Sequence, residues 1–358
     1  MPDAPAICVA CGSDAGPPLL EWTPPHRIHL CRTCGLVFAR PLPTDEALDR
    51  FYQGFAYRRP RVEQVAEQVE ARKREFQRAG FADRARTAGC RLLDFGGGTG
   101  VATLAARELG FDAFLQEVDE QAIRFVVDEL GLPADRVLRV LDAEAGAFDI
   151  IFCDNVIEHV KDPEALLRLL LRHLRPGGEL HVKTPHARNT DALFFPAVNL
   201  RGYLLQSRKK GNRPARCAAA WLRRFWHCEP PRHLYSFSAD SLRRLLERAD
   251  EGGRADPSIR HYWVPLWEYS LSHRERDLLR EAGVGGYARR HLRGLVGSRG
   301  GASLLYRWSL PLLLPAEAAS KLLQWSLRRL RLLSPGGVTL VVRRPAEHPA
   351  PAAATPGG

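Results

Sequence analysis

One stretch decides the fold of this 358-residue chain: Leu92-Leu93-Asp94-Phe95-Gly96-Gly97-Gly98-Thr99-Gly100. Its apolar residues predict a buried strand that runs into a glycine-rich turn, and a helix is expected from Val101 to Leu109. Glycines in such a turn let the backbone approach a ligand closely, and the N-terminus of the following helix offers free N–H groups. We therefore expect a nucleotide-cofactor site at the end of this strand.

The rest of the central region alternates between strand and helix patterns. Further apolar segments predict strands over 113–118, 137–141, 148–153, 179–184 and 338–342, with a second helix over 119–130. Asp162 is a suitable N-cap with Pro163 at the first helical position, and Ser238 caps a later helix. Strand and helix in alternation predict an α/β fold whose parallel sheet carries helices on both faces.

The spacing of the glycines discriminates between cofactors. A dinucleotide fingerprint, G-x-G-x-x-G, fails because its third position is Val101 when counted from Gly96. Counted from Gly98, that position is Thr103, and no G-K-[ST] follows, so a phosphate-binding P-loop is excluded as well. The pattern that fits is D-x-G-x-G-x-G, with Asp94, Gly96, Gly98 and Gly100 in register.

Acidic residues stand at the ends of the first three predicted strands. A sulfonium cofactor has a positively charged amine in its amino-acid head, and Asp94 can hold that amine. Glu117 ends the second strand, where a carboxylate can accept hydrogen bonds from both ribose hydroxyls. Asp142 ends the third strand and is placed to meet the adenine amino group. Glu117 and Asp142, each taken alone, also suit an exposed turn.

With these residues the chain resembles the class I S-adenosylmethionine-dependent methyltransferases over about residues 89–185. Further matching segments are Phe148-Asp149-Ile150-Ile151, Ile157-Glu158-His159-Val160, Leu174-Arg175-Pro176-Gly177-Gly178 and Pro231-Arg232-His233-Leu234-Tyr235-Ser236-Phe237-Ser238. The resemblance implies a Rossmann-like seven-stranded sheet with helices on both faces and an antiparallel last strand, which suits Val338 to Val342. It implies S-adenosylmethionine as cofactor, with contacts at Asp94, Gly96, Gly98, Glu117 and Asp142.

Two cysteine pairs near the N-terminus predict a zinc ribbon. Cys8-x-x-Cys11 and Cys31-x-x-Cys34 are separated by nineteen intervening residues, which is typical of a Cys₄ zinc site. Four unliganded thiols in a loop-rich segment are the alternative. A closed Cys₄ site leaves no open position for a substrate, so its zinc is expected to be structural. The segment Cys34 to Phe38 also resembles the N-terminal ribbon of some bacterial methyltransferases of small-molecule and sugar pathways.

These patterns predict four regions. They are a zinc ribbon over 1–44, a helical connector over 45–88, a methyltransferase domain over 89–345, and a disordered tail over 346–358. The methyltransferase domain is expected to contain a cap insertion at about 186–235, which is apolar first and then basic.

Three residues are candidates for the catalytic chemistry. His159 follows the fourth strand at the catalytic edge, and His233 and Tyr235 lie in the predicted cap. A base is needed only where the nucleophile must lose a proton, and a structural histidine is the competing interpretation of His159. The pair Glu158-His159 resembles ubiquinone-pathway O-methyltransferases, which bind a divalent metal through these two residues and an acid three positions before the Glu. Asn155 stands at that position, so we expect no catalytic metal.

Composition and charge bear on compartment and partners. The net charge is +11, and a basic amphipathic segment over 304–333 can lie on an anionic membrane surface or pack on the sheet. The N-terminus shows no secretory signal, and no segment is long enough to span a bilayer. We therefore expect a cytoplasmic protein, with peripheral membrane contact through the C-terminal helix as a further expectation.

The acceptor is expected to be a small molecule, a sugar or a glycan or lipid-linked precursor, methylated on oxygen. An RNA methyltransferase with a ribbon that binds RNA is the alternative. Against it, the residues after the fourth strand, Asp154-Asn155-Val156-Ile157, lack the Pro-Pro-aromatic motif with which amine methylases hold a flipped base. A binding protein that keeps the cofactor fold without catalysis is a third hypothesis, and retention of the pocket acids argues against it.

Overall fold

The computed structural model describes residues 5–22, 24–54, 62–85, 87, 89–141, 147–187, 226–253, 255–262, 319–320, 322–330, 332–333 and 336–346. The chain divides into two compact units. The first comprises Met1–Pro185, Cys228–Arg260 and Val338–Gly358, and the second comprises His186–His227 and His261–Gly337.

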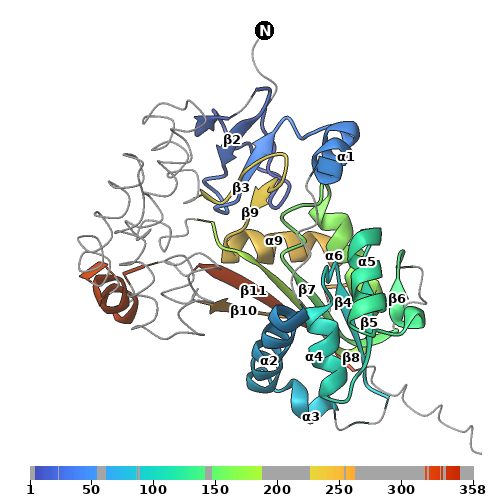
Figure 1. Ribbon diagram of the computed structural model, residues 1–358. Helices are drawn as coiled ribbons and strands as arrows, with labels where there is room; N and C mark the ends of the chain where they lie inside the picture. The colour runs from blue at the N-terminus through green and yellow to red at the C-terminus, as the bar shows by residue number, and fades with distance from the viewer. Residues whose placement is uncertain are drawn as a thin grey trace, which may run out of the picture. The chain divides into compact units, whose positions relative to one another are not determined.

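A seven-stranded sheet forms the centre of the fold, in the order β10-β11-β8-β7-β4-β5-β6 (Figure 1). Its strands are β4 (Arg91–Phe95), β5 (Asp112–Gln116), β6 (Val137–Leu138), β7 (Phe148–Asp154), β8 (Leu174–Pro185), β10 (Asp256–Tyr262) and β11 (Gly337–Arg343). β4 lies between β5 and β7 and is parallel to both. The carboxyl ends of these strands therefore meet at one edge of the sheet, beside the glycine loop.

The last strand, β11, runs antiparallel to its neighbour β8. Gly177 donates its N–H to Arg344 near the start of β8, over 2.9 Å, and His186 donates to Gly336 after its end, over 3.1 Å. These two bonds make β11 antiparallel to β8. The predicted Rossmann-like methyltransferase sheet with its antiparallel last strand is thereby confirmed, whereas β10 was not predicted.

Helices cover both faces of this sheet. α2 (Val62–Arg78), α3 (Phe81–Ala85) and α4 (Val101–Glu108) pack on one face, and α6 (Pro163–His173) and α9 (Ala239–Ala249) pack on the other. The remaining described helices are α1 (Asp45–Gly54) and α5 (Glu120–Arg124). The Asp162 carboxylate accepts a hydrogen bond from the N–H of Ala165 and the Ser238 hydroxyl accepts one from that of Ser241, so both predicted N-caps are confirmed.

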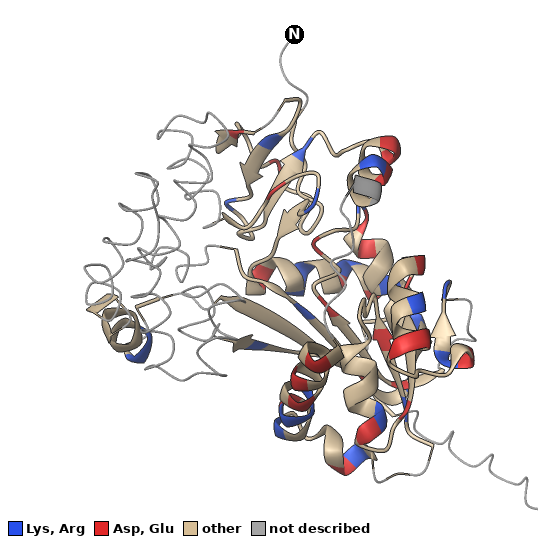
Figure 2. Cartoon of the chain, viewed as in Figure 1, with Lys and Arg blue, Asp and Glu red and all other residues tan. Residues whose placement is uncertain are grey.

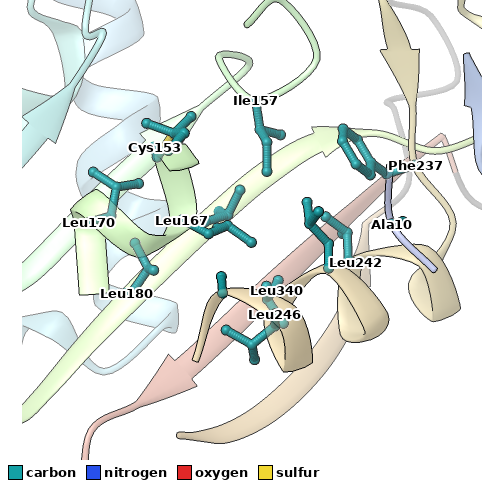
Figure 3. Close-up of a cluster of buried hydrophobic side chains, with 14 of the residues drawn as sticks. Ala10, Cys153, Ile157, Leu167, Leu170, Leu180, Phe237, Leu242, Leu246 and Leu340 are labelled. Atoms are coloured by element: carbon teal, nitrogen blue, oxygen red, sulfur yellow. The ribbon is translucent and has the colours of Figure 1, made fainter. Parts of the chain in front are cut away.

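Side chains alternate between two hydrophobic cores along each central strand. In β4, Leu92 joins the core formed with α2, α3 and α4, whereas Leu93 joins the core formed with α6 and α9. Figure 3 shows the second core, to which α6 contributes Leu167 and Leu170 and α9 contributes Leu242 and Leu246. Strands buried on both faces explain the nearly continuous apolar runs in the sequence.

A second, four-stranded sheet carries the cysteine pairs. Its strands are β1 (Leu20–Glu21), β2 (Arg27–Leu30), β3 (Val37–Arg40) and β9 (Tyr235–Ser236), in that order, with each neighbouring pair antiparallel. We call the cysteine pairs together with β1, β2 and β3 the ribbon. β9 lies at the C-terminal end of the predicted insertion and pairs with β3. Residues Cys228 to Tyr235, which were predicted as part of the insertion, belong to the first unit.

Several predicted segments differ in detail from the structure. The described part of the connector contains three helices, α1, α2 and α3. The first half of α2 carries acidic residues and its second half is mainly basic (Figure 2). The predicted helix over 119–130 is α5 followed by a π-helical turn, η1 (Phe125–Glu129), and a short 3₁₀ turn, η2 (Ala134–Arg136), precedes β6. Most of the predicted insertion and the tail from residue 347 lie outside the described residues. Among the described residues, no helix has the length and apolar character needed to cross a bilayer.

Candidate functional site

The glycine loop between β4 and α4 is tightly packed on one side and open on the other. Gly96, Gly98 and Gly100 have φ values of 66°, 54° and 68°, which favour glycine. A Cβ on Gly97 would lie 2.4 Å from the Asp94 Oδ2 atom, whereas a Cβ on Gly98 would meet nothing within 4 Å. The side of the loop at Gly98 can therefore receive a ligand.

Asp94 is buried beneath the loop, in contact with Gly97. Its carboxylate is 2% exposed, and its Oδ2 atom accepts hydrogen bonds from both the N–H and the hydroxyl of Thr103 in α4, each over 2.9 Å. Burial raises the pKa of Asp94 to about 6. One carboxylate oxygen is thus engaged by α4, and the predicted contact of Asp94 with a cofactor amine stays a prediction.

Glu117 lies beside the open part of the loop, directly after β5. Its Oε2 atom accepts a hydrogen bond from the N–H of Gly98 over 2.8 Å. Its Oε1 atom accepts two more, from the N–H groups of Val118 and Asp119, over 2.7 and 2.9 Å. The carboxylate is therefore fixed at the predicted position next to the loop. Asp142 lies outside the described residues.

Two neighbouring glycines of this loop are expected to respond differently to alanine. Gly97→Ala places a methyl group against buried atoms of Asp94 and Leu115, within 2.4 and 2.6 Å, and overpacking of this kind costs about 1–3 kcal/mol of unfolding free energy. Gly98→Ala meets no atom but keeps a positive φ, at a cost of about 1 kcal/mol. Thermal unfolding and calorimetric titration with S-adenosylhomocysteine would show Gly97→Ala to be the less stable and Gly98→Ala to be stable but impaired in binding. Equal losses of stability in the two variants would contradict this account of the loop.

A charged network that the sequence analysis did not predict lies at the same edge. Arg72 of α2 donates to the Asp154 Oδ2 atom at the end of β7 over 2.7 Å, and its guanidinium stacks 5.0 Å from the centroid of the Phe152 ring. Lys183 of β8 donates to Glu75 over 2.8 Å. The network ties the connector helix to the strand ends. In the sequence, Arg72 is one of many charged residues in a helical segment, so no sequence pattern distinguished it as a functional residue.

The second part of the site is a buried cluster after β7. Glu158, His159 and His233 place one donor atom each within 4.8 Å of one another. Glu158 is 1% exposed, and its Oε2 atom accepts a hydrogen bond from the Thr184 hydroxyl over 3.0 Å. Among the described residues its Oε1 atom has no hydrogen-bond partner, and it lies 3.9 Å from the Nε2 atom of His159. The structure thus brings together two of the three predicted catalytic residues, His159 and His233, beside Glu158.

The tautomer of His159 follows from its backbone contact. The Nδ1 atom lies 2.9 Å from the carbonyl oxygen of Arg232 and 3.3 Å from the Tyr52 hydroxyl. The carbonyl oxygen is the nearer of the two and can only accept, so Nδ1 carries the proton and Nε2 is left as an acceptor. Burial lowers the pKa of His159 to about 4 and raises the pKa of Glu158 to about 7. At neutral pH the imidazole is therefore uncharged, with Nε2 as a hydrogen-bond acceptor, and its lowered pKa makes it a weak base unless a negative charge stabilises the imidazolium.

Tyr235 is placed differently from the two histidines. It is fully buried, and its hydroxyl donates a hydrogen bond to the carbonyl oxygen of Lys161 over 2.8 Å. The hydroxyl proton is thus used within the fold. The structure shows Tyr235 as a link between β9 and the turn after β7, and its predicted catalytic role stays untested.

The cluster also bears on metal binding. Asn155, whose φ is 57°, turns its side chain to donate to Asp154 over 2.9 Å. The structure brings His233 to the pair Glu158 and His159, and these three donors could hold a divalent ion. Asn155 alone therefore does not decide whether a metal binds here.

The four ribbon cysteines form a compact sulfur cluster. Cys8 and Cys34 have their sulfurs 3.6 Å apart, Cys11 and Cys31 have theirs 3.5 Å apart, and all four lie within 4.8 Å of one another. Zinc–sulfur bonds of about 2.3 Å in a tetrahedron require sulfurs about 3.8 Å apart. The donor set and its spacing therefore fit a closed zinc site.

Comparison with known proteins places the chain. The model of a family described as a methyltransferase domain matches residues 55–250, which is more than half of the chain. The chain belongs to this methyltransferase family. The match contains the glycine loop, Glu117, the charged network and the Glu158–His159–His233 cluster, so both parts of the site lie within the region shared with the methyltransferases.

Relatives at moderate identity are O-methyltransferases. The ubiquinone biosynthesis O-methyltransferase of Xanthomonas axonopodis pv. citri is 34% identical over 154 residues, which cover 39% of this chain and 63% of that protein. The protein of the same name from Pseudomonas aeruginosa is 30% identical over 138 residues, covering 36% and 58%. The chain thus spans about three fifths of the length of these relatives.

Solved structures overlap with the chain more loosely. A methyltransferase from Archaeoglobus fulgidus that depends on S-adenosylmethionine is 13% identical with a TM-score of 0.40, covering 77% of this chain and 94% of that one. A putative sarcosine dimethylglycine methyltransferase from Galdieria sulphuraria is 14% identical with a TM-score of 0.38, covering 78% and 86%.

Proposed function

We propose that this methyltransferase uses S-adenosylmethionine to methylate an oxygen atom of a small molecule, a sugar, or a glycan or lipid-linked precursor. The observation that carries the proposal is one arrangement at the carboxyl edge of the sheet. It combines a glycine loop that is open at Gly98, the carboxylate of Glu117 beside it, and a partly buried, neutral imidazole at His159. The names of the O-methyltransferase relatives support oxygen as the methylated atom.

The residues around the loop fit the parts of the cofactor, which supplies an electrophilic methyl group on sulfur when it is bound. Glu117 would accept hydrogen bonds from the ribose hydroxyls, and Asp142 would meet the adenine amino group. Asp94 would hold the amine of the amino-acid head, and the N-terminus of α4 and the cation of Arg72, at the same edge of the sheet, would attract its carboxylate. The open space at Gly98 is the room that such a ligand requires.

The cluster after β7 fits the acceptor. A hydroxyl group of the methyl acceptor must lose its proton as it attacks the methyl group. The Nε2 atom of His159 can act as the base that takes this proton. An ionised Glu158 3.9 Å away would stabilise the imidazolium that forms. His233 lies with its ring centroid 4.7 Å from that of His159, where it can contact the acceptor or, with the other two donors, a divalent ion.

We also infer that Cys8, Cys11, Cys31 and Cys34 hold one structural zinc ion. Metal analysis of protein purified without chelators is expected to give one zinc per chain, and Cys11→Ser is expected to abolish it. Protein that contains no zinc would overturn this assignment.

A screen for methyl transfer tests the function directly. Labelled S-adenosylmethionine is incubated with cell extract separated into RNA, lipid and small-molecule pools, and label is expected in a small-molecule or lipid pool. Label in RNA, together with RNA affinity that falls steeply with salt, would favour the RNA methyltransferase instead. Binding of S-adenosylhomocysteine with no transfer to any pool would favour a binding protein.

The helix at 322–329, in the second unit, supports a contact with membranes. Leu322, Trp325 and Leu330 are 65%, 47% and 67% exposed, and the Arg329 guanidinium lies 4.8 Å from the centre of the Trp325 ring. Exposed apolar side chains beside arginine suit the surface of an anionic bilayer. Flotation is expected with vesicles that contain phosphatidylserine and not with phosphatidylcholine vesicles, and equal recovery with both would contradict the contact.

A further inference from the structure

The ribbon is hydrogen-bonded to the residues that follow His233. We call residues 232–238 the His233 segment. Within it, β9 extends the ribbon sheet, with Tyr235 opposite Phe38 in antiparallel register. The N–H of Ala39 donates to the carbonyl oxygen of Leu234 over 2.9 Å. The last strand of the ribbon therefore fixes the backbone one residue after His233.

The opposite side of the same backbone is held by the candidate site. Leu234 donates its N–H to the carbonyl oxygen of Glu158 over 2.8 Å, and His159 contacts the carbonyl oxygen of Arg232 over 2.9 Å. The His233 side chain between these contacts is 4% exposed. The His233 segment is thus clamped between the ribbon and the turn that carries Glu158 and His159.

A side-chain hydrogen bond connects the segment to the cysteine cluster itself. The Ser238 hydroxyl donates to the carbonyl oxygen of Cys34 over 2.6 Å and accepts from the N–H of Ser241 over 3.0 Å as the N-cap of α9. A Cβ on Gly35 would lie only 3.2 Å from this hydroxyl, so the close approach depends on a glycine after Cys34. One hydroxyl therefore links a predicted metal-ligating residue to the end of the His233 segment.

The ribbon and the methyltransferase sheet also share one hydrophobic core. Figure 3 shows Ala10 of the ribbon beside Phe237 and Leu242, with Ile157 of the turn after β7 nearby. All four side chains are buried. A shift of the ribbon would therefore be felt by the segment through packing as well as through hydrogen bonds.

We propose that the metal-loaded ribbon positions His233 against Glu158 and His159, with Ser238 as the positioning residue that transmits the constraint from Cys34. The inference rests on the zinc site and the acceptor site of the proposed function. It distinguishes two halves of the site: the cofactor half, which is the glycine loop with Glu117, and the acceptor half, which is the Glu158–His159–His233 cluster. The glycine loop takes its contacts from Asp94, Glu117 and Val156, which lie outside the ribbon. Loss of the metal should loosen the acceptor half and leave the cofactor half in place.

Removal of zinc from the full-length protein tests the inference without any acceptor. Zinc is released with an organomercurial and a chelator, and hydrogen exchange of peptides is followed by mass spectrometry before and after zinc is restored. Amide exchange at residues 234–236 is expected to rise by at least about tenfold, while peptides of β4 and the glycine loop keep their protection. Affinity for S-adenosylhomocysteine is expected to stay within about twofold, as for independent sites.

A matched pair of serine variants keeps the zinc in place. Ser238→Ala removes the hydroxyl that reaches Cys34, whereas Ser241→Ala removes its partner in the same capping box and leaves that link. Ser238→Ala is expected to raise exchange at 234–236 by roughly fivefold, the effect of losing the one hydrogen bond to Cys34, and to change the ring-nitrogen NMR signals of His233 in ¹⁵N-histidine-labelled protein. In turnover it should lower kcat more than it changes the KM of the cofactor.

Three results would overturn the inference. They are unchanged exchange at 234–236 after zinc removal, equal effects of Ser238→Ala and Ser241→Ala, and global exchange with loss of S-adenosylhomocysteine binding in the stripped protein. A preparation that transfers no methyl group would count against the proposed function alone, because exchange and histidine signals are measured without an acceptor.

Discussion

His159→Gln is expected to lower kcat for methyl transfer by roughly 10²–10⁴-fold, the usual contribution of a positioned general base. The reason is that the Nε2 atom of His159 accepts the proton of the attacking hydroxyl, which an amide cannot do. Affinity for S-adenosylhomocysteine should change little, because the glycine loop takes its contacts from other residues. Steady-state turnover with the acceptor found by the labelled screen, together with calorimetric titration, measures the two quantities.

The chain offers a matched control for this substitution. The Nδ1 atom of His26 also contacts a backbone carbonyl oxygen, that of Pro41 over 2.8 Å, but His26 lies between β1 and β2, and this contact involves neither the cysteine cluster nor the His233 segment. His26→Gln should therefore leave kcat unaltered. A His159→Gln protein that retains full turnover would remove His159 from the mechanism and leave a bound metal or the acceptor's own acidity to account for deprotonation.

The pH dependence of turnover should report Glu158. Its pKa is raised by burial to about 7, so the carboxylate is protonated below that pH and ionised above it. Since the ionised form stabilises an imidazolium at His159, kcat should rise with pH through about 7 and then level off. Glu158→Gln should abolish this rise, and a wild-type profile that falls over the same range would contradict the assigned role.

Local sequence patterns were sufficient to predict those helices and strands whose capping residues or apolar runs are visible in the sequence itself. The caps at Asp162 and Ser238 and the strand of β11 depend on neighbouring residues, and the structure has all three. β10 escaped prediction because it is an edge strand with mostly exposed side chains and no apolar alternation. The same limit applies to the π-helical turn η1, whose apolar residues resemble those of an ordinary helix.

Contacts between distant segments could not be predicted in this way. His233 was chosen as a candidate from a family resemblance, but its approach to His159, 74 residues earlier, depends on β9 joining the ribbon. Arg72 likewise meets Asp154 only because α2 packs beside the strand ends. The topology of the fold decides which acidic and basic side chains become neighbours. The spacing of these residues along the sequence therefore does not predict such contacts.

Glu117→Ala is expected to weaken S-adenosylhomocysteine binding by about 10²-fold. A carboxylate that accepts from both ribose hydroxyls makes two hydrogen bonds to a charged group, each contributing about 1.5 kcal/mol or more, and 1.4 kcal/mol corresponds to about tenfold in affinity. Glu117→Gln keeps one acceptor oxygen and should bind with intermediate affinity. Calorimetric titration gives the affinities, and thermal unfolding shows whether the loop has lost its support as well.

Asp119→Ala separates recognition of the ribose from general loosening of the strand end. Asp119 lies two residues further along and carries the same charge, but its carboxylate caps α5 by accepting from the N–H groups of Gln121 and Ala122. Its loss should cost about 1 kcal/mol of unfolding free energy with little change in affinity. Equal affinity losses in Glu117→Ala and Asp119→Ala would indicate a structural role for both acids. Affinity at the wild-type level in Glu117→Ala would mean that the ligand does not sit at the end of β5, and the cofactor assignment would fail with it.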